Sequence, residues 1–194
     1  MSANELRKVR ESPGESKADS WILNDLPEKL VEDWYSNFVY SEFDMQAAAY
    51  YWLRKYFENE RSERWFLRSQ PLIELSHGPT KEDTFVKPDI TIYKGTQLVD
   101  AIELKCQLDG LQIPSINKDL EKLRTLKTDL RHAYMFVLYD DELSGDFIER
   151  RVAREEWMKN YLTFVWANVR RHNNGRMRNN YSSQRKKWDI YWRR

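Results

Sequence analysis

The sequence predicts an α/β protein with a mixed sheet flanked by helices. Three observations lead to this fold class. Short apolar segments typical of strands are separated by longer segments in which apolar residues recur every three or four positions. Two of the strand segments are joined by a tight turn, so they are expected to pair in antiparallel fashion. A helical segment connects the second of them to a further apolar strand, which favours a parallel pair.

The N-terminal part contains a polar arm and two predicted helices. Residues 1–20 are polar and are expected to form a flexible arm. The segment LPEKLVEDWYSNF (26–38) places apolar residues four apart, which predicts an amphipathic helix with Pro27 in its first turn. Ser41 and Asp44 have the spacing of a capping box and begin a second, longer helix.

Three strands are expected next. The segment PLIEL (71–75) is a short strand, and TFVKPDITIY (84–93) is the second. The turn KGT (94–96) leads into the third strand, QLVDAIELKCQL (97–108). The second and third strands therefore form a hairpin.

The remaining elements complete the sheet. Residues 115–130 carry one apolar stripe and predict a helix, and HAYMFVLY (132–139) is apolar enough to be a central strand buried on both faces. A polar helix is expected around 148–160 and a further strand at 161–169. The end, 188–194, is either a last short strand or a tail.

The composition is that of one domain with a heavily ionised surface. The chain has 194 residues, of which 32% are charged, and residues 21–169 are expected to form the domain. No apolar run is long enough to span a bilayer, so no membrane partner is expected. The single cysteine, Cys106, excludes an intrachain disulfide and favours the reducing cytoplasm.

Positive charge is concentrated at the C-terminal end. Residues 150–194 contain thirteen Lys and Arg but three acidic residues, on a chain whose net charge is +1. This basic, aromatic extension (170–194) suits a polyanion such as nucleic acid, because arginines contact phosphates and aromatic rings stack on bases. A solvated tail explains the charge equally well. The candidate contacts in the extension are Arg170, Arg171, Arg176, Arg178, Arg185, Lys186, Lys187 and Trp188.

The hairpin carries an unusual set of charged residues. Strand alternation puts Ile102, Leu104 and Cys106 on one face, and Glu103 and Lys105 on the other together with Gln107. Asp89 and Glu103 lie at similar distances from the turn, so they are expected to be cross-strand neighbours. Two carboxylates that close repel each other unless a cation lies between them.

Such a pair indicates a metal site with hydrolytic chemistry. Carboxylate oxygens favour Mg²⁺ or Mn²⁺, which also bind phosphates and lower the pKa of a bound water. Lys105 is placed to orient that water or to stabilise charge in the transition state. These are the parts of a phosphodiesterase.

At these residues the sequence resembles the PD-(D/E)XK nuclease superfamily, whose restriction-endonuclease-like core has the order αβββαβ. The resemblance covers about half of the chain and rests on Pro88-Asp89, on Glu103-Leu104-Lys105 and on the order of elements. It implies a metal site at Asp89, Glu103 and Leu104, and a lysine, Lys105, that assists the attacking water.

Further residues are weaker candidates. The resemblance suggests an acid from the first core helix, for which Glu42 is the best placed, and an accessory role for Gln107. Glu42 could equally be a first-turn acid that favours the helix dipole. Glu74 is a surface residue or an accessory ligand, and Lys118 and Lys122 are a solvated face or the border of a nucleic-acid groove.

The leading hypothesis is a magnesium-dependent nuclease, most readily of DNA, acting as an endonuclease or an exonuclease. A homodimer would help to cut two strands, although no segment marks an interface. One alternative is an inactive module of the same fold that binds nucleic acid or a partner in a larger complex. Another is an unrelated α/β interaction protein whose Asp89 and Glu103 do not cluster.

Overall fold

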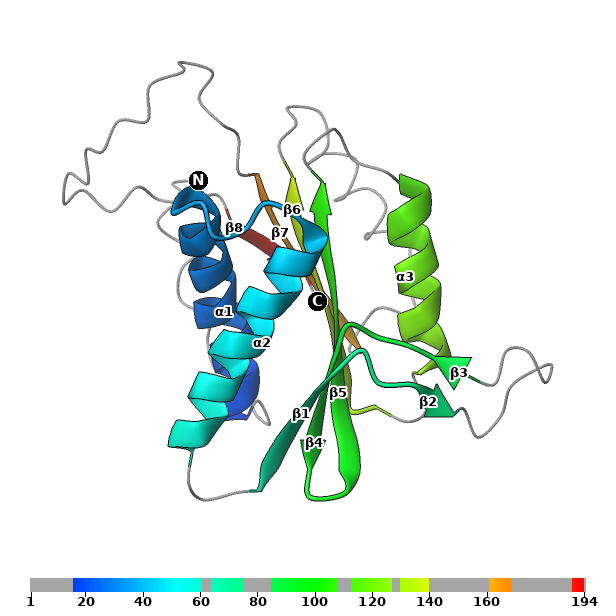
Figure 1. The fold of residues 1–194 in the computed structure, drawn as a ribbon. Coiled ribbons are helices and arrows are strands. Elements are labelled where there is room, and N and C mark those ends of the chain that lie inside the picture. Colours follow the sequence, from blue (N-terminus) through cyan, green and yellow to red (C-terminus); the bar gives the residue numbers. More distant parts are fainter. Residues whose placement is uncertain are drawn as a thin grey trace, which may run out of the picture.

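The computed structural model describes residues 16–60, 64–74, 85–107, 113–126, 130–139, 161–168 and 190–193. It is an α/β protein with a mixed six-stranded sheet of strand order β1-β4-β5-β6-β7-β8. Helices α1 and α2 cover one face of this sheet and α3 covers the other (Figure 1). The predicted fold class, a mixed sheet flanked by helices, is confirmed at this level.

Helix α1 (Lys17–Tyr35) begins well before the expected segment. Ser16 is its N-cap and forms a capping box with Asp19, whose side chain accepts a hydrogen bond from the Ser16 N–H. The predicted flexible arm, residues 1–20, therefore extends too far along the chain, because residues 17–20 belong to this helix. Pro27 was also misplaced: it lies inside the helix, where burial of the apolar face offsets the lost backbone hydrogen bond.

Helix α2 (Glu42–Asn59) begins as the sequence indicates. Ser41 is its N-cap, and its hydroxyl accepts a hydrogen bond from the Asp44 N–H over 3.1 Å. Glu42 is therefore the first helical residue, at the end of α2 that lies near the end of β5 (Figure 1).

The first strand of the main sheet was not predicted. It is β1 (Trp65–Ser69), which pairs antiparallel with β4 (Ile90–Lys94). The expected strand 71–75 contributes only β2 (Ile73–Glu74), which pairs with β3 (Phe85–Val86) in a separate two-stranded sheet. The expected strand 84–93 is thus divided between two sheets, with Asp89 between the halves.

The predicted hairpin is confirmed. Strand β4 pairs antiparallel with β5 (Gln97–Gln107), and Gly95 in the turn has φ of 62°, a conformation that favours glycine. The described part of β4 begins at Ile90, opposite Ile102, whereas β5 continues to Gln107. The last five residues of β5, 103–107, therefore have no β4 partner, and this opening locates the candidate site.

The second half of the sheet follows the predicted order. Strand β5 pairs parallel with β6 (His132–Tyr139), and β6 pairs parallel with β7 (Leu162–Asn168). Helix α3 (Ile113–Thr125) forms the crossover between β5 and β6. The helix expected around 148–160 lies outside the described residues.

The C-terminal end of the described chain returns to the sheet. Strand β8 (Ile190–Arg193) pairs antiparallel with β7, which agrees with the alternative of a last short strand. The described residues contain no helix that is long and apolar enough to cross a membrane.

Alternation along β5 divides the core into two layers. Ile102 and Leu104 pack with α1 and α2, and Cys106 packs against the edge of the same cluster. Ala101 faces the opposite way, toward Leu120 and Leu123 of α3. Glu103 and Lys105 share this second face by strand alternation, so they point toward α3 near the open end of β5.

Candidate active site

Asp89 and Glu103 are brought together across the hairpin as expected. Because Ile90 pairs with Ile102 in antiparallel register, the residue before Ile90 lies opposite Glu103. The Asp89 carboxylate also accepts a hydrogen bond from the Leu104 N–H, with 2.9 Å between Oδ2 and N. The carboxylate is thus fixed against β5 although Asp89 lies outside the regular strand.

A second set of contacts holds the Asp89 backbone. The Asp89 carbonyl accepts hydrogen bonds from the Gln46 side chain, over 2.9 Å, and from the Gln70 N–H, over 2.8 Å. Gln46 is a buried residue of α2, and it also donates to the Ser69 hydroxyl. Helix α2 and the residue after β1 therefore hold the main chain of Asp89, whereas the Leu104 N–H holds its carboxylate.

Glu103 is a buried carboxylate whose two oxygens have different environments. Its side chain is 1% exposed, and Oε2 lies 2.9 Å from the Lys122 ammonium. The other oxygen, Oε1, has no hydrogen-bond partner among the described residues. Burial, and after it repulsion from Asp89, raises the pKa of Glu103 well above its ordinary value. Burial likewise raises the pKa of Asp89, against the hydrogen bond from Leu104.

Lys105 joins the two helix layers. Its ammonium lies 2.9 and 3.0 Å from the two oxygens of Glu42 and 2.8 Å from Oδ2 of Asp119. Glu42 comes from α2 and Asp119 from α3, and both contact Lys105 in the part of β5 that extends past β4. Burial opposes the charge of Lys105, but the hydrogen bonds to Asp119 and Glu42 outweigh it and raise its pKa.

Asp119 and Lys122 complete the cluster from α3. Asp119 Oδ1 lies 2.7 Å from Lys122 Nζ, and the same ammonium contacts Glu103. A continuous chain of ion pairs thus runs from Glu42 through Lys105, Asp119 and Lys122 to Glu103. We call these five residues together with Asp89 the carboxylate–lysine cluster; its formal charge is −2 when every member is ionised.

The other expected site residues have different environments. The Leu104 side chain is buried in the core, so only its main chain faces the cluster. Glu74 is exposed on β2 and is not a member of the cluster. Lys118 is exposed on α3, whereas Lys122 is held by carboxylates instead of forming a solvated face.

Several candidates cannot be compared with the structure. The side chain of Gln107 lies outside the described residues. The same holds for the proposed contacts of the extension, Arg170, Arg171, Arg176, Arg178, Arg185, Lys186, Lys187 and Trp188.

The sequence analysis did not identify two residues of the site: Asp119, which belongs to the cluster, and Gln46, which holds the Asp89 backbone. Asp119 lies within the apolar stripe of α3, three residues after Ile116 and four before Leu123, so a charged residue at a core-facing position was the available signal. Gln46 had no comparable signal, because its partners Ser69 and Asp89 are distant in sequence.

A second buried polar cluster lies at the other end of β5. Asp100 is fully buried, and its carboxylate lies 2.9 Å from the Arg131 guanidinium, which also contacts Asp19 of α1. The Tyr134 hydroxyl donates to Asp19 over 2.8 Å. These contacts fasten the first turn of α1 to the sheet.

The chemistry of the donors fits one divalent cation at the carboxylate–lysine cluster. Within the described part of the chain, no three His, Cys, Asp or Glu residues are arranged as a preformed metal site. The donors available are Asp89 and the free oxygen of Glu103, both oxygen ligands of the kind that Mg²⁺ and Mn²⁺ prefer. Mg²⁺ commonly binds through one or two carboxylates, with water and phosphate at its other positions.

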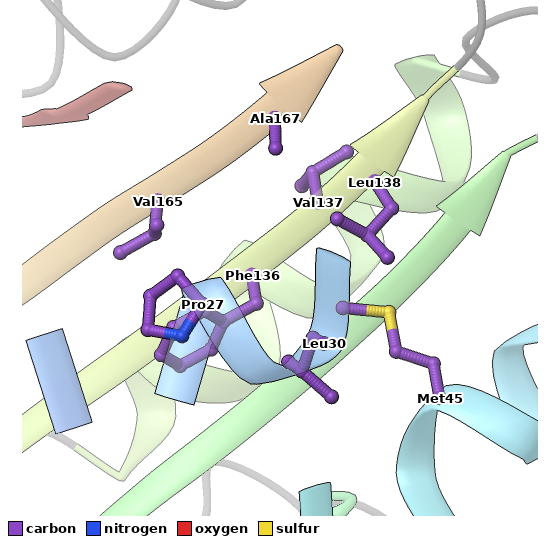
Figure 2. A pocket seen from close by; sticks show the side chains of 8 residues that line it. All are labelled: Pro27, Leu30, Met45, Phe136, Val137, Leu138, Val165 and Ala167. Atoms are coloured by element: carbon purple, nitrogen blue, oxygen red, sulfur yellow. The ribbon is translucent and has the colours of Figure 1, made fainter. Parts of the chain in front are cut away.

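A small pocket elsewhere has no such chemistry. It lies between α1, α2 and strands β6 and β7 (Figure 2), and all eight lining side chains are apolar: Pro27, Leu30, Met45, Phe136, Val137, Leu138, Val165 and Ala167. It offers no acid–base group and no oxygen or nitrogen ligand for a metal, so it is not a candidate for the chemistry of the carboxylate–lysine cluster.

Comparison with known proteins adds no identification. No protein-family model, curated protein or solved structure was found to match the chain.

Proposed function

We propose that this protein is a metal-dependent nuclease of the restriction-endonuclease-like fold, which hydrolyses phosphodiester bonds, most readily in DNA. One observation carries the proposal. Two carboxylates, Asp89 and Glu103, adjoin each other in a buried setting, and a lysine follows two residues further along β5. Among the residues that the structure describes, Glu103 Oε1 has no hydrogen-bond partner. The cost of burying such a pair falls when a divalent cation binds between them.

Four members of the cluster have proposed roles in catalysis: Asp89, Glu103, Lys105 and Glu42. Asp89 and Glu103, with the Leu104 carbonyl, would hold Mg²⁺ or Mn²⁺, which would supply a Lewis acid for the phosphate and a bound water of lowered pKa. Lys105 orients that water for in-line attack on phosphorus, as the ester oxygen on the opposite side leaves.

Glu42 has a positioning role in this scheme. Its carboxylate lies in contact with the Lys105 ammonium on both oxygens, so it fixes the direction of that ammonium. The sequence suggests Glu42 as an outer or second metal ligand, but its contact with Lys105 favours the positioning role.

The test is the variant Lys105→Ala. It is expected to fold and to bind nucleic acid but to lose cleavage of linear, circular and single-stranded DNA and RNA in Mg²⁺ or Mn²⁺. Lys17→Ala is the matched control, because Lys17 is exposed at the first position of α1 and is not a member of the cluster. Equal cleavage by wild type and Lys105→Ala would exclude the catalytic assignment.

A further inference from the structure

Lys122 occupies the position of a counter-ion for the metal-binding carboxylate. Its ammonium lies 2.9 Å from Glu103 Oε2 and 2.7 Å from Asp119 Oδ1. The side chain of Glu103 is 1% exposed and that of Asp119 is 5% exposed, whereas Lys122 is 27% exposed. Lys122 is therefore the one member of this trio with access to solvent.

We propose that Lys122 neutralises Glu103 in the metal-free protein, is displaced from it by the divalent cation, and then binds a phosphate of the nucleic acid. Lys122 is thus a positioning and substrate-binding residue that exchanges partners when the site is loaded. This inference rests on the proposed function, because it takes Glu103 as a metal ligand.

Electrostatics gives the reason for the exchange. A divalent cation bound by Glu103 and Asp89 would lie close to the Lys122 ammonium, and like charges at such distances repel strongly in a buried setting. The cation would bind the free oxygen Oε1 of Glu103, whereas Lys122 contacts Oε2 of the same carboxylate. A cation of higher charge draws the negative charge of the carboxylate toward Oε1 and weakens the contact at Oε2, so Lys122 moves toward solvent through its exposed side.

Asp119 determines where the released ammonium goes. It holds Lys122 through Oδ1 and Lys105 through Oδ2, so one carboxylate connects both lysines. After release from Glu103, Lys122 keeps this contact and remains beside the site. An ammonium held next to a bound metal, on the exposed side, is placed to contact a phosphate oxygen.

The experiment is a titration with Mn²⁺ alone, by calorimetry and by the electron paramagnetic resonance of free Mn²⁺. Lys122→Met keeps the length of the side chain but removes its charge. It is expected to bind Mn²⁺ roughly tenfold more tightly than wild type, because the competing cation is gone. Lys122→Arg keeps the charge and is expected to retain the wild-type affinity.

The control is Lys118→Met, which removes the same charge one turn earlier on α3, where Lys118 is exposed. It is expected to leave the Mn²⁺ affinity unchanged. Circular dichroism checks that each variant is folded, and Lys122→Gln replaces Lys122→Met if the latter does not fold. Equal or weaker Mn²⁺ binding by the neutral variant would overturn the inference and leave the proposed function standing. Absence of Mn²⁺ binding by the wild type would overturn both.

Phosphate binding is tested by the salt dependence of binding to hydrolysis-resistant phosphorothioate DNA. In Mn²⁺, Lys122→Met is expected to reduce the slope of log K against log salt by about one, the loss of one phosphate contact. In EDTA the slopes of wild type and variant are expected to agree, since Lys122 is then bound to Glu103. An equal slope in Mn²⁺, or an equal loss in EDTA, would refute the exchange of partners.

Discussion

We predict that the variant Asp100→Asn makes the stability of this protein less dependent on pH between about 4 and 6. Asp100 is fully buried, and Arg131 Nη2 lies 3.2 and 2.9 Å from its two oxygens. Burial nevertheless dominates and raises the pKa of Asp100 from 3.8 to about 6. The folded state therefore holds this proton more tightly than the unfolded chain does.

The sign and size of the effect follow from this difference. Because the folded state binds more protons, the stabilisation is present at low pH and is lost as the pH rises through the folded-state pKa. The complete shift corresponds to about 3 kcal/mol, at 1.36 kcal/mol for each pKa unit. Between roughly pH 4 and pH 6.5, where the experiment is practical, about 2 kcal/mol of it is lost.

Urea unfolding over this pH range measures the effect. Between the two ends of this range, the unfolding free energy of Asp100→Asn is expected to fall by about 2 kcal/mol less than that of wild type. Glu28→Gln, at an exposed position of α1, is the control and is expected to follow wild type. Parallel curves for wild type and Asp100→Asn would show that burial does not control the ionisation of this group.

Two further predictions concern the support of the site and the basic extension. Gln46→Leu is expected to cost about 1–2 kcal/mol in urea unfolding, because it removes the hydrogen bonds from Gln46 to the Asp89 carbonyl and the Ser69 hydroxyl, and to weaken Mn²⁺ binding several-fold by loosening the Asp89 backbone; unchanged Mn²⁺ affinity would contradict this support role. The triple change of Arg185, Lys186 and Lys187 to Gln is expected to reduce the salt slope of DNA binding by up to about three; the same slope in both proteins would remove these residues from the interface.

The hairpin could be predicted because its signals are local. The turn at Gly95 and the alternation along 97–108 fix which residues of β5 share a face. A one-residue shift of register between Ile92 and Tyr93 then places Asp89 opposite Glu103, and this shift has no signal in the sequence analysis. Strand β1 was missed because it has no comparable local signal. It is an edge strand whose residues are exposed or half-buried, and its pairing with β4 joins distant parts of the chain.

The start of α1 was also predicted wrongly, although a local signal for it is present in the sequence. The capping box of Ser16 and Asp19 is a local signal, but it lies before the apolar repeat that identified the helix. Its first turn is fastened to the sheet through Arg131, which contacts Asp100 and also contacts Asp19, a residue 112 positions earlier in the chain. A search for caps before each repeat would have found this start.

The sequence by itself determined the α/β class, the hairpin, and the neighbouring positions of Asp89, Glu103 and Lys105, because strand alternation and turn geometry act over a few residues. Only the tertiary structure decided that Glu42 and Asp119 meet at Lys105 and that Lys122 pairs with Glu103. These contacts depend on how α2 and α3 pack on opposite faces of the sheet, and on the early end of β4. Such packing is set by the whole core, so the charges around the candidate metal site could not be derived from any single segment.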